Sequence, residues 1–194
     1  MSGKPVTAFV GDRLTAEGRW SDGLPDDEVL NLGVAGNTTD DLIARLGEVI
    51  DARPDTVLLM IGTNDIAWNR SVEHIVRNIE TIIATLRREL PESQLVVESV
   101  LPREREFAAR IKDVNRHLRQ FAPTQRAQYL DLWPQFALDD GVLAPEFSED
   151  GLHLSELAYR VWLGEVRTAL EELRNLPPSS RAILLPRLAS GELA

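Results

Sequence analysis

The chain has no cysteine among its 194 residues. Disulfide bonds, metal sites built on thiolates and cysteine nucleophiles are therefore excluded. No hydrophobic run reaches membrane-spanning length, so we expect no transmembrane segment. The first five residues, MSGKP, are too short for a signal peptide, and the apolar run after them has the length of a strand. From these absences we expect a cytoplasmic location.

Basic residues are scarce relative to acidic ones. The chain has 21 Lys and Arg against 31 Asp and Glu, which gives a formal net charge of −10. Such a surface repels phosphate backbones, so we expect no nucleic-acid partner. Hydrophobic residues make up 43% of the chain, which is ordinary for a globular protein with a core of its own.

The length suits a single domain, which we place over residues 1–175. The Pro-Pro-Ser-Ser run that follows breaks regular structure, and the stretch AILLPRL beyond it is apolar. We therefore predict a C-terminal tail over residues 176–194 that packs on its own domain or on a second subunit of a homo-oligomer.

Short apolar runs alternate with longer segments of helical period. The runs are rich in Val, Ile and Leu without strict alternation, as is typical of strands buried on both faces; they span residues 6–10, 29–32, 56–61, 94–101 and 128–132. Apolar residues three and four apart mark helices over residues 43–50, 72–86, 107–121 and 157–173. This alternation predicts an α/β protein with a parallel sheet and helices on both faces.

Glycine and polar residues follow the predicted strands, at the edge where ligands bind in open α/β sheets. Gly36 has no side chain, so its N–H can approach a substrate oxygen closely, and the Asn64 amide is a second donor. With the backbone N–H of Arg13, these groups could form an oxyanion hole. Taken singly, each residue is better explained as a turn residue or a helix cap.

Asp150 and His153 lie three residues apart, just before the last predicted helix. This spacing can place the carboxylate against the imidazole, which fixes the tautomer and leaves the other ring nitrogen as a general base. A surface hydrogen bond is the alternative for this pair alone. Candidate residues of this kind lie at four successive positions along the predicted sheet edge. This repetition favours a single shared site over a set of unrelated turns and caps.

Four stretches carry a family resemblance. The stretches FVGDRLT, NLGVAGNTTDDL, MIGTND and EDGLHLS resemble, in order and spacing, the signature blocks of the SGNH hydrolase superfamily, also called GDSL lipases or acylhydrolases. The resemblance covers the chain from residue 6 to about residue 173. It implies a flavodoxin-like, three-layer α/β/α sandwich with a five-stranded parallel sheet, and an ester-hydrolysing activity without cofactor or metal.

The resemblance also implies roles for individual residues. Gly36 and Asn64 match the family's oxyanion donors, His153 matches its base, and Asp150 matches the residue that orients the base. Position 13 matches the nucleophilic serine, but this chain has Arg13 there. A guanidinium keeps its proton in proteins and is no nucleophile near neutral pH. We therefore expect the acyl-enzyme mechanism to be impaired or lost.

Two functional interpretations remain open. The first is an ester hydrolase with an altered mechanism, such as attack by water with His153 as base. The second is a pseudoenzyme of the same fold that binds an anionic or acyl ligand without turnover. In both cases the expected partner is a small-molecule ester or anion.

Further candidate contacts to the substrate or anion lie near the motifs. Asp12 precedes Arg13, Trp68 closely follows Asn64, and Arg103 follows the fourth strand. The alternatives are a role in the core or at the surface for Trp68 and an exposed, self-neutralised loop for Arg103. For Arg13 the alternative is a plug that folds back onto Asp12 or Asp150.

Overall fold

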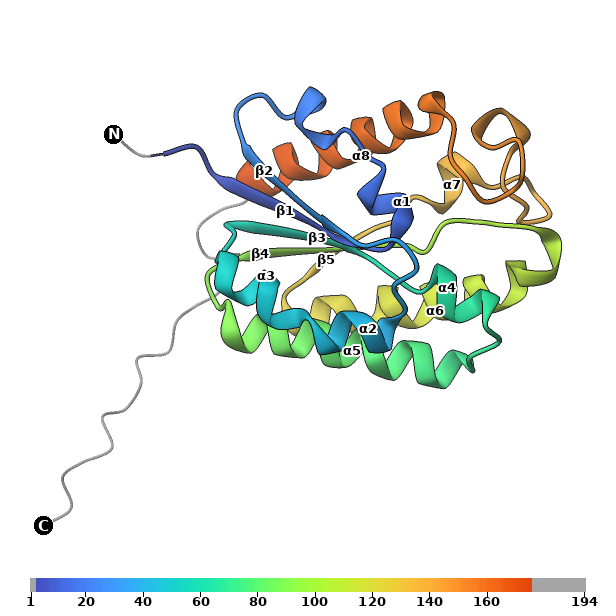
Figure 1. The fold of residues 1–194 in the computed structure, drawn as a ribbon, viewed down its shortest axis with the longest axis horizontal. Helices are drawn as coiled ribbons and strands as arrows, with labels where there is room; N and C mark the ends of the chain where they lie inside the picture. The colour runs from blue at the N-terminus through green and yellow to red at the C-terminus, as the bar shows by residue number, and fades with distance from the viewer. Residues whose placement is uncertain (1–2, 176–194) are drawn as a thin grey trace, which may run out of the picture.

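The protein, described by a computed structural model over residues 3–175, is built on a five-stranded, all-parallel sheet (Figure 1). The strand order is β2-β1-β3-β4-β5, the flavodoxin-like order. The strands are β1 (Val6–Gly11), β2 (Glu28–Gly33), β3 (Thr56–Met60), β4 (Gln94–Glu98) and β5 (Gln128–Leu130). All five predicted strands are present, although the last three end one to three residues earlier than predicted. The predicted tail lies outside the described residues.

Helices cover both faces of the sheet (Figure 1). One layer consists of α2 (Thr39–Ala44), α3 (Leu46–Ala52), α4 (Thr63–Ala67), α5 (Val72–Glu89) and α6 (Arg105–Phe121). The other contains α1 (Arg13–Ala16), α7 (Trp133–Phe136) and α8 (Glu156–Asn175). Short 3₁₀ turns lie at Trp20–Gly23, Ala122–Gln125 and Pro145–Phe147. The predicted three-layer α/β/α sandwich is confirmed.

Strand β1, an inner strand of the sheet, contributes to the core on both faces, because successive side chains of a strand point to opposite faces. Ala8 and Val10 pack with the α5 and α6 layer, whereas Phe9 belongs to the cluster under α8. The ring of Phe9 stacks on Trp20 at 4.3 Å between centroids, and Trp162 meets Trp20 edge-on at 4.9 Å. These aromatic contacts hold the turn at Trp20–Gly23 and α8 against the same side of the sheet.

The buried face of α8 differs from the one that its sequence predicts. Leu157, a member of the predicted apolar face, is exposed, while Trp162 is fully buried. Trp162 contributes a large apolar surface, and its Nε1 donates a 2.8 Å hydrogen bond to Oε1 of the buried Glu98. Burying this side chain turns the helix so that Leu157 faces solvent.

Local capping explains why α2 begins where it does. The Thr38 hydroxyl accepts from the N–H of Asp41, and the Asp41 carboxylate accepts from the N–H of Thr38. This reciprocal pair is the capping box that the Thr38-x-x-Asp41 spacing predicts. It places the first turn of α2 directly after the loop that carries Gly36.

Replacing Thr38 by alanine should lower the free energy of unfolding by about 1 kcal/mol, because the cap at the start of α2 is lost. Urea unfolding of Thr38→Ala measures the change. Thr168→Ala, at an exposed position within α8, is the matched control and should leave stability nearly unchanged. Equal stability of Thr38→Ala and wild type would contradict the role of the capping box.

None of the described helices is both long enough and apolar enough to cross a membrane.

Candidate active site

A cavity of about 240 Å³ opens at the carboxyl edge of the sheet. Four predicted site residues line it: Arg13, Gly36, Asn64 and His153. Asp12, a predicted contact residue, also lines it. The other lining residues are Leu14, Thr63 and Leu152, and each neighbours a predicted site residue in the sequence.

The turn from β1 into α1 is too tight for any side chain at Gly11. A Cβ atom there would lie 2.2 Å from both the Met60 carbonyl oxygen and Thr15 Oγ1. The turn makes Asp12 the N-cap of α1, with Oδ1 accepting from the N–H of Leu14 at 2.9 Å. Arg13 is consequently the first residue of α1, where a backbone N–H has no acceptor within the helix.

The loop after β2 carries Gly36 and is held by Arg45, a residue that sequence reasoning missed. Nη2 of Arg45 donates to the carbonyl oxygens of Gly11 at 3.1 Å and Leu32 at 3.0 Å, while its Nε donates to Asn37 Oδ1. The loop turns through a φ of +81° at Gly36, a region that favours glycine. Among residues 3–175, the N–H of Gly36 donates to no protein acceptor.

The start of α4 presents Asn64 to the cavity. Its Nδ2 donates to the Asn37 carbonyl at 2.8 Å, which uses one of the two amide N–H groups and leaves the second for a ligand. Behind it, the fully buried Asp65 accepts from the hydroxyl of Thr39 at 2.6 Å and from its N–H at 2.9 Å. This brace ties α4 to α2, so the donors of Gly36 and Asn64 are held together.

Asp150 and His153 form the predicted pair in the turn before α8. Asp150 Oδ1 accepts from the N–H groups of Leu152 and His153, at 2.9 and 2.7 Å. Oδ2 lies 2.6 Å from Nδ1 of His153. The hydrogen bond from the imidazole, followed by those from the backbone, holds the pKa of Asp150 well below its usual range.

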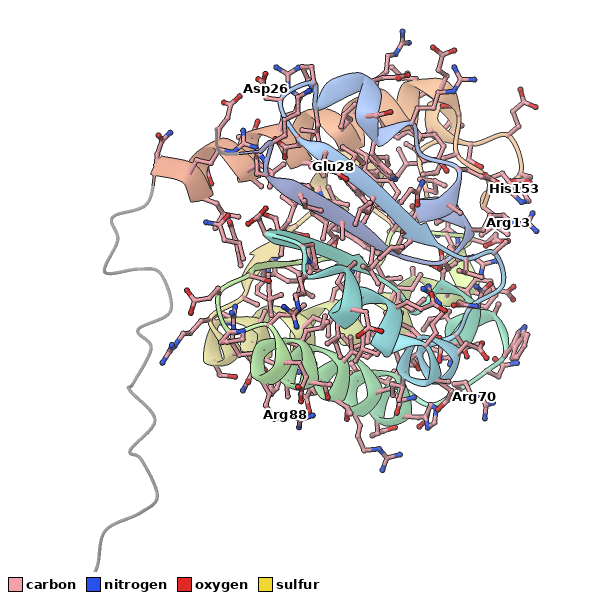
Figure 2. The ribbon with its side chains drawn as sticks, turned by 60° about the vertical axis from the view of Figure 1, so that its left-hand side comes forward. Arg13, Asp26, Glu28, Arg70, Arg88 and His153 are labelled. Atoms are coloured by element: carbon pink, nitrogen blue, oxygen red, sulfur yellow. The ribbon has the colours of Figure 1, made fainter. Side chains whose placement is uncertain are left out.

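Arg13 reaches across the cavity mouth to His153 (Figure 2). Its Nη1 lies 3.1 Å from Nε2 of the imidazole. A guanidinium can only donate, so Nε2 is the acceptor and the ring proton is on Nδ1, where it donates to Asp150. The lone pair that would act as the base is therefore occupied by a permanent cation.

The alternative in which Arg13 folds back onto an aspartate is wrong. Among the described residues its side-chain partners are His153 and one acidic residue, Glu17, with Nε and Oε1 4.0 Å apart. Asp12 is buried, and its Oδ2 has no hydrogen-bond partner within residues 3–175. Burial raises the pKa of Asp12 to about 7, so this carboxyl beside the cavity exchanges its proton near neutral pH.

Two predicted contact residues do not line the cavity. Trp68 ends α4 one turn after Asn64, and 64% of its surface is exposed. Arg103 is buried, with Nη1 donating to the Thr63 carbonyl at 3.3 Å and its guanidinium 4.7 Å from the Phe107 ring. Arg103 thus supports the start of α4 from behind, contrary to the exposed loop that its glutamate neighbours suggested.

One group of side chains outside the cavity has the composition of a metal site. Ligand atoms of Asp40, Asp65 and His74 lie within 4.8 Å of one another. His74 Nε2 is 2.9 Å from Asp40 Oδ2, and the Asn78 amide donates to Asp40 Oδ1 at 2.8 Å. Both oxygens of Asp65 already accept from Thr39. The group is a hydrogen-bonded brace between α2, α4 and α5, with an amide donor directed into it.

The sequence profile of the GDSL-like lipase/acylhydrolase family matches residues 2–161, which include all four signature stretches. The chain belongs to this family. Among curated relatives, the platelet-activating factor acetylhydrolase IB subunit alpha1 of Pongo abelii is 30% identical over 168 residues, which cover 80% of this chain and 71% of that protein. The rat subunit is 29% identical over 167 residues, with the same coverage.

Solved structures of GDSL-like proteins share the fold. A GDSL-like lipase from Bacteroides thetaiotaomicron superposes with a TM-score of 0.78 at 21% identity, covering 88% of this chain and 89% of that one. A catalytic mutant of an acetylxylan esterase from Geobacillus stearothermophilus gives a TM-score of 0.76 at 19% identity, covering 87% and 94%. At these identities the likeness establishes the α/β/α architecture alone.

Proposed function

We propose that this GDSL-like protein binds a small anion, a carboxylic acid or an ester that carries one, and that hydrolysis through an acyl-enzyme is lost. The observation that carries the proposal is the 3.1 Å contact between Arg13 Nη1 and His153 Nε2 at the cavity. A fixed cation occupies the position of the family's nucleophile. It has no hydroxyl for His153 to activate.

The other groups at the cavity support anion binding. The N–H of Gly36 and one N–H of the Asn64 amide lack protein acceptors among the described residues, and the guanidinium adds a positive charge beside them. Charge-assisted hydrogen bonds from such donors are the strong ones in proteins. The volume of about 240 Å³ falls below that of sites for drug-sized ligands, so the expected ligand is small.

A second candidate is hydrolysis by water, with His153 as general base. It is favoured by the Asp150 pair, which keeps the imidazole in the tautomer whose Nε2 can accept a proton. Gly36 and Asn64 would then stabilise the oxyanion of the tetrahedral intermediate. This route forms no acyl-enzyme and shows no burst of the first product.

Acetate binding tests the first proposal. Calorimetric titration at constant ionic strength should give a dissociation constant for Arg13→Gln at least tenfold weaker than for wild type, because the glutamine carries no charge. Arg105→Gln is the matched control, since Arg105 is an exposed arginine of α6 that pairs with Asp140 away from the cavity. Equal affinities of wild type and Arg13→Gln would refute the anion site.

A cytoplasmic location of the protein and its self-association into a homo-oligomer stay predictions.

A further inference from the structure

We propose that Arg13 is a displaceable cap on His153, so that the site hydrolyses esters that carry their own carboxylate in preference to neutral ones. The inference rests on the proposed anion site, because the carboxylate of the substrate must be able to bind the guanidinium. It adds to that proposal a substrate class, esters that carry a carboxylate, and a mechanism by which the bound carboxylate makes His153 available as the base.

The cap blocks the base in two ways. Nε2 of His153 already accepts from Arg13 Nη1, so a water molecule in the cavity cannot pass its proton there while the contact lasts. Protonating the ring would also place an imidazolium beside a guanidinium, which like-charge repulsion opposes. A neutral ester offers nothing that relieves either effect.

A carboxylate on the substrate relieves both effects. It can accept the guanidinium's hydrogen bonds in a bidentate arrangement, which competes with the single bond to the imidazole. Its negative charge also offsets the cation while His153 takes up a proton. An anion bound at Arg13 therefore frees Nε2 and makes it a usable base.

The structure gives Arg13 room to move. Its side chain is 51% exposed, and His153 lies at the same surface (Figure 2). Glu17, one turn along α1, approaches its Nε at 4.0 Å from outside the cavity. Among residues 3–175, no further acceptor binds this guanidinium, so a single hydrogen bond separates the capped arrangement from the open one.

The reaction that follows is a balanced hydrolysis. The oxygen of a water molecule attacks the ester carbonyl carbon, and one of its protons passes to Nε2 of His153. The carbonyl oxygen becomes an oxyanion beside the N–H groups of Gly36 and Asn64. The intermediate then collapses, the bond to the alcohol oxygen breaks, and His153 returns the proton to that oxygen. When the carboxylate is on the acyl part, as in a monoester of a dicarboxylic acid, the products are the dicarboxylic acid and an alcohol.

Monomethyl succinate and methyl levulinate are suitable probes, because they differ mainly in a carboxylate against a methyl ketone. Methanol release by wild type, followed by NMR at constant ionic strength, should show a kcat/KM at least tenfold higher for monomethyl succinate. Arg13→Ala removes both the cap and the anchor, so the two esters should then differ by less than threefold. Arg105→Ala should keep the wild-type preference, and His153→Ala should hydrolyse neither ester.

Three outcomes would overturn the inference: equal kcat/KM values for the two esters in wild type, no hydrolysis of either, or an unchanged preference in Arg13→Ala. The acetate titration separates these outcomes from a failure of the proposed function. If acetate binds through Arg13 but no ester is hydrolysed, the anion site stands and the displaceable cap does not. If acetate does not bind, the anion site itself fails.

Discussion

Replacing Arg13 by serine is expected to raise the kcat/KM for p-nitrophenyl acetate on the order of 10³-fold over wild type. The substitution removes the cation from Nε2 of His153 and supplies the hydroxyl that the family uses as its nucleophile. The Asp150 pair and the donors of Gly36 and Asn64 are already in place around the cavity. Loss of a triad serine costs several orders of magnitude, so its return should recover a large part of them.

Two comparisons make this result specific to a nucleophile. Arg13→Ala removes the cap without adding a hydroxyl, so it should stay at least tenfold below Arg13→Ser. The double variant Arg13→Ser with His153→Ala should return to the background rate, because the serine then has no base. Stopped-flow measurements on Arg13→Ser should also show a burst of nitrophenol from acyl-enzyme formation. An Arg13→Ser variant no faster than Arg13→Ala would mean that His153 does not serve a nucleophile at position 13.

Replacing Glu98 by glutamine should make the protein markedly more stable at pH 8. Glu98 is buried at the end of β4, where burial raises its pKa from 4.5 to about 7 while a hydrogen bond from Trp162 offsets part of the effect. A pKa difference of one unit corresponds to about 1.4 kcal/mol, so ionising this group inside the fold costs on the order of 3 kcal/mol. Glutamine keeps the acceptor for Trp162 and cannot ionise.

The direction of the pH dependence follows from proton binding. Between about pH 4.5 and pH 7 the folded chain keeps the Glu98 proton that the unfolded chain has lost, so the free energy of unfolding falls as pH rises through this window. Asp12, with its pKa also raised by burial to about 7, contributes in the same direction. In Glu98→Gln the contribution of Glu98 to this pH dependence is absent, and that of Asp12 remains.

Urea unfolding at pH 5 and pH 8 measures the effect. The wild-type stability should fall between these values by about 2 kcal/mol more than that of Glu98→Gln. Glu171→Gln, an exposed position on α8, is the control and should follow wild type. An identical fall in Glu98→Gln and wild type would show that Glu98 ionises in the folded chain as readily as in the unfolded one.

Both predictions concern a residue at the carboxyl end of a strand: Arg13 follows β1, and Glu98 ends β4. Parallel strands deliver their ends to one edge, so residues that follow β1, β2 and β3 meet there although they are far apart in the chain. Hydrogen-bonded side chains outside the cavity hold this edge in place. Arg45 fixes the loop of Gly36, and Asp65 ties α4 to α2. Substituting Arg45 or Asp65 would therefore disturb the N–H donors of Gly36 and Asn64, although neither side chain would contact a ligand.

The sequence predicted the strands and the shared position of Arg13, Gly36, Asn64 and His153 because each depends on local pattern. Apolar runs and turn residues mark where a strand ends, and the signature stretches add the order and spacing of the blocks. Arg45 and Asp65 were missed for a different reason. Arg45 lies between two helical segments and Asp65 within a short one, where nothing in the spacing distinguishes a side chain that hydrogen-bonds to a neighbouring element from one that faces solvent.

The sequence by itself determined the parallel α/β architecture, the family and the absence of a hydroxyl at position 13, since periodicity and residue identity are properties of short stretches. Only the tertiary structure decided where the Arg13 side chain goes. Its partner His153 lies 140 residues away in the chain, and the two meet because β1 and the turn before α8 end at the same edge. A long side chain with several rotatable bonds takes its direction from such distant contacts. The occupied lone pair of His153 could therefore not be predicted from the residues alone.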